Sequence, residues 1–193
     1  MLLKVKPLNG AQRKALIYFI VFQKLRNPHL IESVKKSLVQ SFTLEKKLDK
    51  SSDDQYLTSV YESLYNNSNL YRDMIYPLLY SEWVIVRASN PEFVLPDVCN
   101  VFGNYENEKY VLMPLTPTDC LIILPIRVRE PRVVPYYIKG SKKLVSKISD
   151  VLCFNAQSDF LSHKDALLIN NIESTDDKIK NIIMSLINEI SDR

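Results

Sequence analysis

Proline is concentrated in one stretch of this 193-residue chain, where seven of its ten prolines lie between Pro91 and Pro135. Proline has no backbone N–H and is disfavoured inside helices and central strands, so this stretch is expected to form short elements separated by turns. Its apolar runs are of strand length and rich in β-branched and aromatic residues. They predict four strands, at residues 83–87, 92–95, 110–113 and 120–128. The spacing favours a small antiparallel meander, and the continuous run LIILP (121–125) predicts a strand covered on both faces.

Helical patterns precede this block. Asn9 can cap a first helix at residues 12–25, whose apolar residues fall mostly on one stripe. Its solvent side is expected to carry Arg13, Lys14 and Lys24. Three more helices are expected before the first strand, at about 29–48, from Asp53 or Asp54 to Tyr65, and at 70–79.

Helical patterns also follow the block. Ser141 can cap one long helix or two over residues 142–164. Apolar spacing in 179–190 predicts an amphipathic helix, which we expect to dock on the core, with a role as a handle for a partner as the alternative. The order of elements predicts an α+β fold with an N-terminal helical layer, a small, mainly antiparallel sheet and C-terminal helices. We expect one domain over 1–193, helical in 11–80, strand-rich in 82–138 and helical in 141–191.

Composition limits the functional classes. No uncharged apolar run approaches the ~18 residues of a membrane span, and the first residues lack the apolar stretch of a secretory signal. We therefore expect a cytoplasmic protein with no membrane partner. The chain has no glycine-rich phosphate loop and no histidine pair at metal spacing, so neither a cofactor nor a metal is expected. Cys99, Cys120 and Cys153 show no metal-binding spacing and are expected to be buried free thiols.

Two segments carry a resemblance to a known family. The first, Ala15–Pro28, reads ALIYFIVFQKLRNP, and the second, Trp83–Pro125, contains WVIVRASNPEFVLPDVCN and YVLMPLTPTDCLIILP. From about Ala11 to Asn170 the chain resembles the bacterial domain-of-unknown-function family numbered 4238. In that family an amphipathic helix ends in Arg-x-Pro, and a later Trp and strand precede the motifs Ser-Asp-Asn-Pro and Pro-Leu-[Ser/Thr]-Pro.

The chain departs from the family where polar chemistry would lie. Members carry His-His-x-x-Pro upstream of the first helix, and this motif is missing from the sequence. Ser-Asp-Asn-Pro aligns with Pro96-Asp97-Val98-Cys99, so only Asp97 is kept. If the two histidines and the Asp-Asn pair are the family's active groups, one of four remains, and a lone base supports little catalysis. We therefore favour a role without catalytic residues.

Arg26 and Asp97 form a candidate remnant site. A guanidinium at a helix end can form a forked pair with a carboxylate from a strand turn. Such a pair would either clamp the helical layer to the sheet or be what is left of a ligand site. Asp97 can alternatively cap its own turn.

A second candidate is a patch of arginines that could bind an anion or nucleic acid. Arg127 and Arg129 are two apart on an expected strand, hence on one face, and Arg132 follows. With the basic first fifty residues, which carry a net charge of +8, they could contact phosphates. Glu130 dilutes the patch and the pI is only about 8.6, so an ordinary solvated strand end is the alternative.

A third candidate is a tyrosine-rich partner surface in residues 51–109, which carry a net charge of −6. Tyrosine contributes a large contact area with little loss of side-chain entropy, although packing within the core is the alternative. The surface would include Tyr56, Tyr61, Tyr65, Tyr71 and Tyr76.

Three function classes follow. Our main expectation is a non-catalytic protein-binding or regulatory module, a shortened family member that docks on a partner protein or forms a homo-oligomer. Phage–bacterium conflict, as antiviral defence or counter-defence, would suit such a protein. The alternatives are a nucleic-acid-binding protein that uses the arginine patch, and a hydrolase or nuclease-like enzyme with an unrecognised site.

Overall fold

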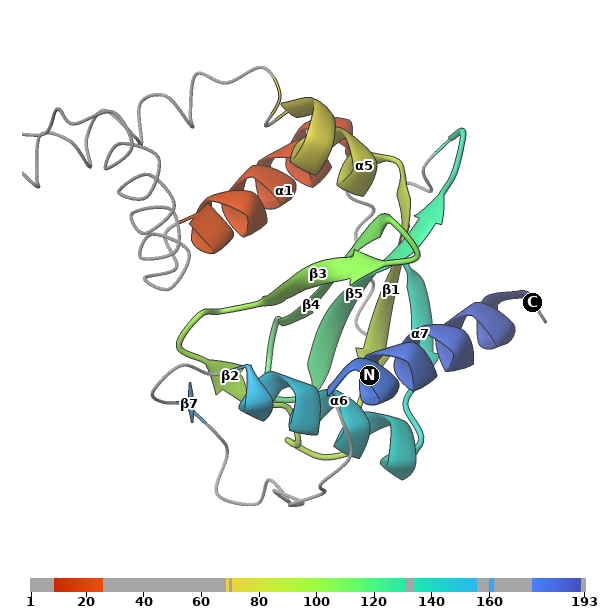
Figure 1. The fold of residues 1–193 in the computed structure, drawn as a ribbon. Helices are drawn as coiled ribbons and strands as arrows, with labels where there is room; N and C mark the ends of the chain where they lie inside the picture. The colour runs from red at the N-terminus through yellow and green to blue at the C-terminus, as the bar shows by residue number, and fades with distance from the viewer. Residues whose placement is uncertain are drawn as a thin grey trace, which may run out of the picture.

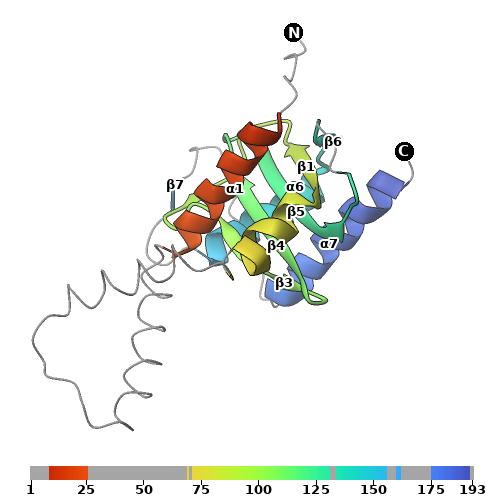
Figure 2. The same cartoon turned by 90° about the horizontal axis from the view of Figure 1, so that it is seen from above.

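A computed structural model describes residues 9–25, 69, 71–130, 134–155, 160–161 and 175–191. Within them, a five-stranded sheet lies between two helical layers (Figures 1 and 2). One layer contains α1 (Gly10–Leu25), the π-helical turn η1 (Tyr71–Ile75) and α5 (Tyr76–Leu79). The other contains α6 (Lys142–Phe154) and α7 (Thr175–Ser191). The predicted α+β fold class is confirmed.

The sheet has the strand order β3-β4-β5-β1-β6. Its members are β1 (Ser81–Arg87), β3 (Val101–Tyr105), β4 (Glu108–Pro114), β5 (Asp119–Arg127) and β6 (Tyr136–Lys139). All neighbours are antiparallel except β1 and β6, which run parallel. Two short strands, β2 (Leu95–Pro96) and β7 (Phe160–Leu161), pair separately.

The two central strands, β1 and β5, are buried on both faces. Along β1, Val84 and Val86 belong to the core under α6 and α7, whereas Trp83 and Ile85 belong to the core under α1 and α5. β5 alternates in the same way, because successive side chains of a strand point to opposite faces. The prediction that the LIILP strand is covered on both sides is confirmed.

Both predicted helix caps are present. Gln12 donates its N–H to Asn9 Oδ1 at 2.8 Å, and Gln12 Oε1 accepts from the Asn9 N–H at 3.0 Å. This reciprocal pair satisfies two N–H groups that α1 leaves without helical partners. At α6, the Ser141 hydroxyl accepts from the Leu144 N–H at 3.2 Å.

Arg13 was expected on the solvent side of the first helix, and this prediction is wrong. Its side chain is buried, donates from Nη2 to the Ser81 carbonyl, and stacks with its guanidinium carbon 4.0 Å from the centroid of the Trp83 ring. Burial lowers the pKa of Arg13 to about 10. A planar, delocalised cation tolerates this packing on an aromatic ring better than a lysine would.

The other predicted helices are confirmed only in part. The helix expected over residues 142–164 is present as α6 up to Phe154, but residues 160–161 form the strand β7, which pairs with β2, so the prediction is wrong there. The helix expected at 70–79 is present as η1 followed by α5, and Pro77 has no N–H to continue the ladder between them. The helices expected at 29–48 and up to Tyr65 lie outside the described residues. The last helix docks on the core as predicted, through Ile179, Ile182, Ile183 and Leu186.

The strand predictions need correction at several places. Residues 92–95 do not form a strand beyond the short β2, because the N–H groups of Glu92 and Phe93 both donate to the Pro117 carbonyl. β3 and β6 were not predicted. The cysteine prediction is also only partly right: Cys120 is buried, but Cys99 and Cys153 are partly exposed, in a turn and in the last turn of α6.

Candidate functional site

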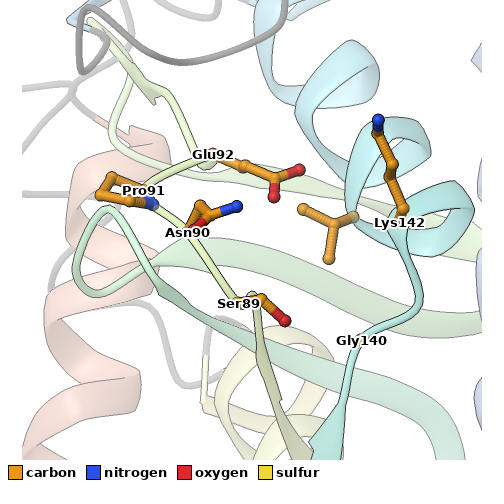
Figure 3. A pocket seen from close by; sticks show the side chains of 7 residues that line it. Ser89, Asn90, Pro91, Glu92, Gly140 and Lys142 are labelled. Atoms are coloured by element: carbon orange, nitrogen blue, oxygen red, sulfur yellow. The ribbon is translucent and has the colours of Figure 1, made fainter.

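A cavity of about 540 Å³ lies beyond the carboxyl ends of β1 and β6 (Figure 3). One wall is the loop that follows β1, and the other is the turn from β6 into α6. Ligand sites commonly lie where parallel strands end and helices begin, because the loops there leave a crevice. Its lining residues are Ser89, Asn90, Pro91, Glu92, Gly140, Lys142 and Val145.

The loop wall is fixed by backbone hydrogen bonds. Ala88 N–H donates to the Thr118 carbonyl at 2.8 Å, and Glu92 N–H donates to the Pro117 carbonyl at 2.9 Å. From the other side, the buried Ser149 hydroxyl of α6 donates to the Glu92 carbonyl at 2.8 Å. Both the N–H and the carbonyl of Glu92 are therefore hydrogen-bonded, so the backbone that carries its carboxylate is fixed.

The helix wall is fixed by a close approach of backbones. Gly140 N–H donates to the Arg87 carbonyl at 2.8 Å. A Cβ at Gly140 would lie 2.6 Å from Val145 Cγ2 and 2.9 Å from Val86 Cγ1, so a side chain there has no room. This approach brings Lys142, in the first turn of α6, to the edge of the cavity.

The turn in the Pro-Leu-Thr-Pro motif supports the loop wall. Thr116 Oγ1 accepts from the N–H groups of Thr118, at 3.2 Å, and Asp119, at 2.9 Å. Asp119 in turn forms a forked ion pair with Arg87, at 2.7 Å to Nε and 3.3 Å to Nη2. The pair raises the pKa of Arg87, chiefly through the hydrogen bond to Asp119. Arg87 thus links the turn, through its side chain, to the helix wall, through its carbonyl.

The cavity presents four polar side chains: Ser89, Asn90, Glu92 and Lys142 (Figure 3). Ser89, Asn90 and Lys142 are exposed and Glu92 is half-buried. Within the described part of the chain, none of these four side chains makes a hydrogen bond or ion pair with another residue. A hydroxyl, an amide, a carboxylate and an ammonium are therefore available to a bound group, with Pro91 and Val145 as apolar surface beside them.

The predicted remnant site does not coincide with this cavity. Asp97 lies exposed in the turn after β2, where its carbonyl accepts from Cys99 Sγ at 3.9 Å. Arg26 lies outside the described residues, so a pair between Arg26 and Asp97 stays a prediction.

The arginine patch is only partly described. Arg127 pairs through Nε with Glu108 Oε2 at 2.8 Å, which neutralises part of the expected positive charge. β5 ends at Arg127, so Arg129 follows in an exposed bend and does not share a strand face with it. Arg132 lies outside the described residues. Use of the patch by nucleic acid stays a prediction.

The tyrosine surface is represented mainly by Tyr76. This side chain is 43% exposed, and its ring centroid lies 4.5 Å from that of Tyr80. Tyr71 begins η1, while Tyr56, Tyr61 and Tyr65 lie outside the described residues. The tyrosine surface also stays a prediction.

Sequence reasoning did not single out the residues of the cavity. The segment SNPE (89–92) is typical of a turn and Ser141 is typical of a helix cap, but no pattern within either segment indicates that the two lie close together. Their proximity follows from the parallel pairing of β6 with β1, in which Val86 lies opposite Ile138 and Arg87 opposite Lys139. The sequence contained two local signals, a turn after one strand and a cap before a helix. It contained no signal for the pairing of β6 with β1, which brings the two together.

No three His, Cys, Asp or Glu side chains in the described ranges gather where they could hold a metal ion. None of the helices described here is both long and apolar enough to cross a membrane.

Comparisons with known proteins gave one match. A family model described as "Protein of unknown function (DUF4238)" matches residues 2–166. No curated protein and no solved structure shows a significant match to this chain.

Proposed function

We propose that this chain, which belongs to the DUF4238 family, is a non-catalytic binding module that docks on a partner protein. In this proposal a segment of the partner enters the cavity between the loop after β1 and the start of α6. The observation that carries the proposal is the set of four polar side chains, on two fixed walls, that make no hydrogen bond or ion pair with one another or with other described residues.

Fixed walls favour binding. A site whose backbone is already held loses little conformational entropy when a partner binds. The cavity volume of about 540 Å³ is within the range that accommodates a few residues of a peptide. Catalysis would in addition need an acid, base or nucleophile with an orienting partner.

The family comparison supports the non-catalytic part of the proposal. Asp97 is the one residue kept from the Ser-Asp-Asn-Pro motif, and it lies in an exposed turn outside the cavity lining. By contrast, the Pro-Leu-Thr-Pro turn holds the loop wall through the Pro117 carbonyl. One of the family features that this chain keeps, the Pro-Leu-Thr-Pro turn, thus supports the cavity wall. A setting in phage–bacterium conflict remains part of the proposal on the sequence argument alone.

The nucleic-acid alternative is weaker. Arg127 is engaged by Glu108, and a phosphate would have to displace that carboxylate. The enzyme alternative has no described cluster that would support a particular reaction.

Site-specific photo-crosslinking in the cells of origin tests the docking proposal. A benzoylphenylalanine in place of Asn90 should crosslink to one defined protein. The same probe in place of Lys180, exposed on α7, should not. The double charge reversal E92K/K142E should change the yield from position 90 severalfold in a folded protein. No crosslink from position 90, or equal crosslinks from both positions, would contradict docking at the cavity.

A further inference from the structure

We infer that the cavity recognises a pair of opposite charges, a cationic group and an anionic group carried close together on one partner segment. This inference rests on the proposed function and specifies the chemistry of the bound segment. A lysine or arginine next to an aspartate or glutamate in an extended peptide has this chemistry.

The charges of the cavity are divided between its walls. Glu92 projects from the loop wall, and Lys142 rises from the first turn of α6 on the other wall (Figure 3). Neither side chain pairs with the other or with another described residue. Two opposite charges that stay apart across a cavity present a positive and a negative subsite, and a zwitterionic group satisfies both.

The neutral residues fit the same occupant. Asn90 offers an amide that can both donate and accept, which suits the backbone of a peptide. Pro91 and Val145 provide apolar surface against which the aliphatic stem of a lysine or arginine can lie. A purely anionic or purely cationic ligand would leave one charged wall facing a group of its own sign.

The charged contacts are partly exposed, so each should change affinity by about two- to fivefold. That is small for a single contact, and specificity must come from the two charges acting together. The test therefore compares probes that differ only in charge.

The chain offers a direct reporter of the cavity. It contains three glycines, Gly10, Gly103 and Gly140, so the intact protein labelled with ¹⁵N-glycine gives three backbone amide signals. Gly140 lines the cavity, Gly10 begins α1, and Gly103 lies on β3 at the opposite edge of the sheet from β6. The two remote glycines are internal controls in the same spectrum.

The probe is the capped dipeptide acetyl-Lys-Glu-amide. We expect it to shift the amide signal of Gly140 in a saturable way and to leave the signals of Gly10 and Gly103 unchanged. Acetyl-Gln-Gln-amide, which has neither charge, should bind at least about fourfold more weakly, because both charged contacts are lost. No movement of Gly140, or equal movement with both probes, would overturn the inference.

Charge-removing variants assign the two subsites. Glu92→Gln should weaken binding of acetyl-Lys-Glu-amide and of acetyl-Lys-Gln-amide by about two- to fivefold, because both carry the cation. Lys142→Gln should weaken only probes that carry the glutamate. The matched controls Glu130→Gln and Lys143→Gln, at exposed positions outside the lining, should have no effect. Equal sensitivity of all probes to both cavity variants would contradict the assignment.

Two comparisons separate this inference from the docking proposal. If position 90 crosslinks to a protein but no charged dipeptide moves Gly140, docking stands and the charge-pair inference falls. If the dipeptide moves Gly140 but position 90 never crosslinks, the charge-pair chemistry stands and docking falls. Tighter binding of the free amino acid leucine than of the capped dipeptide would point to a free zwitterion and overturn a peptide occupant.

Discussion

Gly140 shows how one residue can determine the shape of a cavity. Its N–H holds the Arg87 carbonyl, and the space where a side chain would stand is filled by Val145 and Val86. Its backbone does not have a positive φ, so the requirement for glycine comes from close packing and not from an unusual conformation. Alanine substitutions at Gly140 and at Gly10 should therefore have different effects on the free energy of unfolding.

Replacement of Gly140 by alanine is expected to lower the free energy of unfolding by about 1–3 kcal/mol, because the new methyl group overpacks the contact between α6 and β1. Gly10→Ala is the matched control. A Cβ there meets nothing within 4 Å, and alanine at the start of α1 should be neutral or stabilise by up to about 1 kcal/mol. Urea unfolding of both variants checks this. Equal stability of the two would show that α6 can move away without cost.

At the scale of single elements, the Pro-Leu-Thr-Pro turn acts as a support for its neighbours. It is closed by the Thr116 hydroxyl, it pairs Asp119 with Arg87, and it holds the loop wall through Pro117 and Thr118. The motif is therefore explained by hydrogen bonding inside the fold and needs no ligand of its own.

Thr116→Val is expected to destabilise the protein by about 1 kcal/mol, because it removes the side-chain acceptor of the Thr118 N–H and leaves the Asp119 N–H only its longer hydrogen bond, to the Thr116 carbonyl at 3.3 Å. Thr118→Val is the isosteric control, since the Thr118 hydroxyl contacts only Thr116 Oγ1, at 3.1 Å, among the described hydrogen bonds. It should cost less than half as much in thermal or urea unfolding. A larger loss in the control would mean that the side chain of Thr118 closes the turn instead.

Local sequence patterns were sufficient for the elements that are fixed locally. Asn9 and Ser141 identify the starts of α1 and α6 through their own side chains. The alternating or continuous apolar runs identify β1, β4 and β5, since those strands are buried by direct contact with the helices.

The elements that were missed depend on partners elsewhere in the chain. β3 contains Gly103, which weakens its strand pattern, and the ring of Tyr110 on β4 covers the gap that the glycine leaves. The β3–β4 turn uses Glu106 and Asn107 with positive φ and contains no glycine to signal it. The cavity was missed for the same reason, because the position of β6 beside β1 is not encoded within either strand.

At the scale of the whole molecule, the contacts of α7 with the rest of the described fold include apolar packing and a buried ion pair. Lys178 Nζ lies 3.2 Å from Asp150 Oδ2 of α6, and the two side chains are only 8% and 9% exposed. A buried pair of this kind stabilises little overall, because desolvation offsets the attraction, but loss of one partner leaves an uncompensated charge.

Asp150 and Lys178 are therefore expected to be strongly coupled. Lys178→Met alone should destabilise the protein by about 3–5 kcal/mol, whereas the double variant D150L/K178M should lose much less than the sum of the two single variants. A double-mutant cycle by urea unfolding measures this coupling. Lys180→Met, at an exposed position of the same helix, is the control and should change stability by less than about 0.5 kcal/mol. Additive losses would show that the pair does not act as a unit.

The pairing of β1 with β6 also has a consequence for how the molecule folds. Val84 pairs with Tyr136, 52 positions later, whereas the nearest pair across β3 and β4, Tyr105 and Glu108, is 3 positions apart. Closing the longer loop costs more chain entropy, so this contact should form after the hairpin. The cavity walls meet only when β6 reaches β1, which makes the cavity one of the last features to assemble.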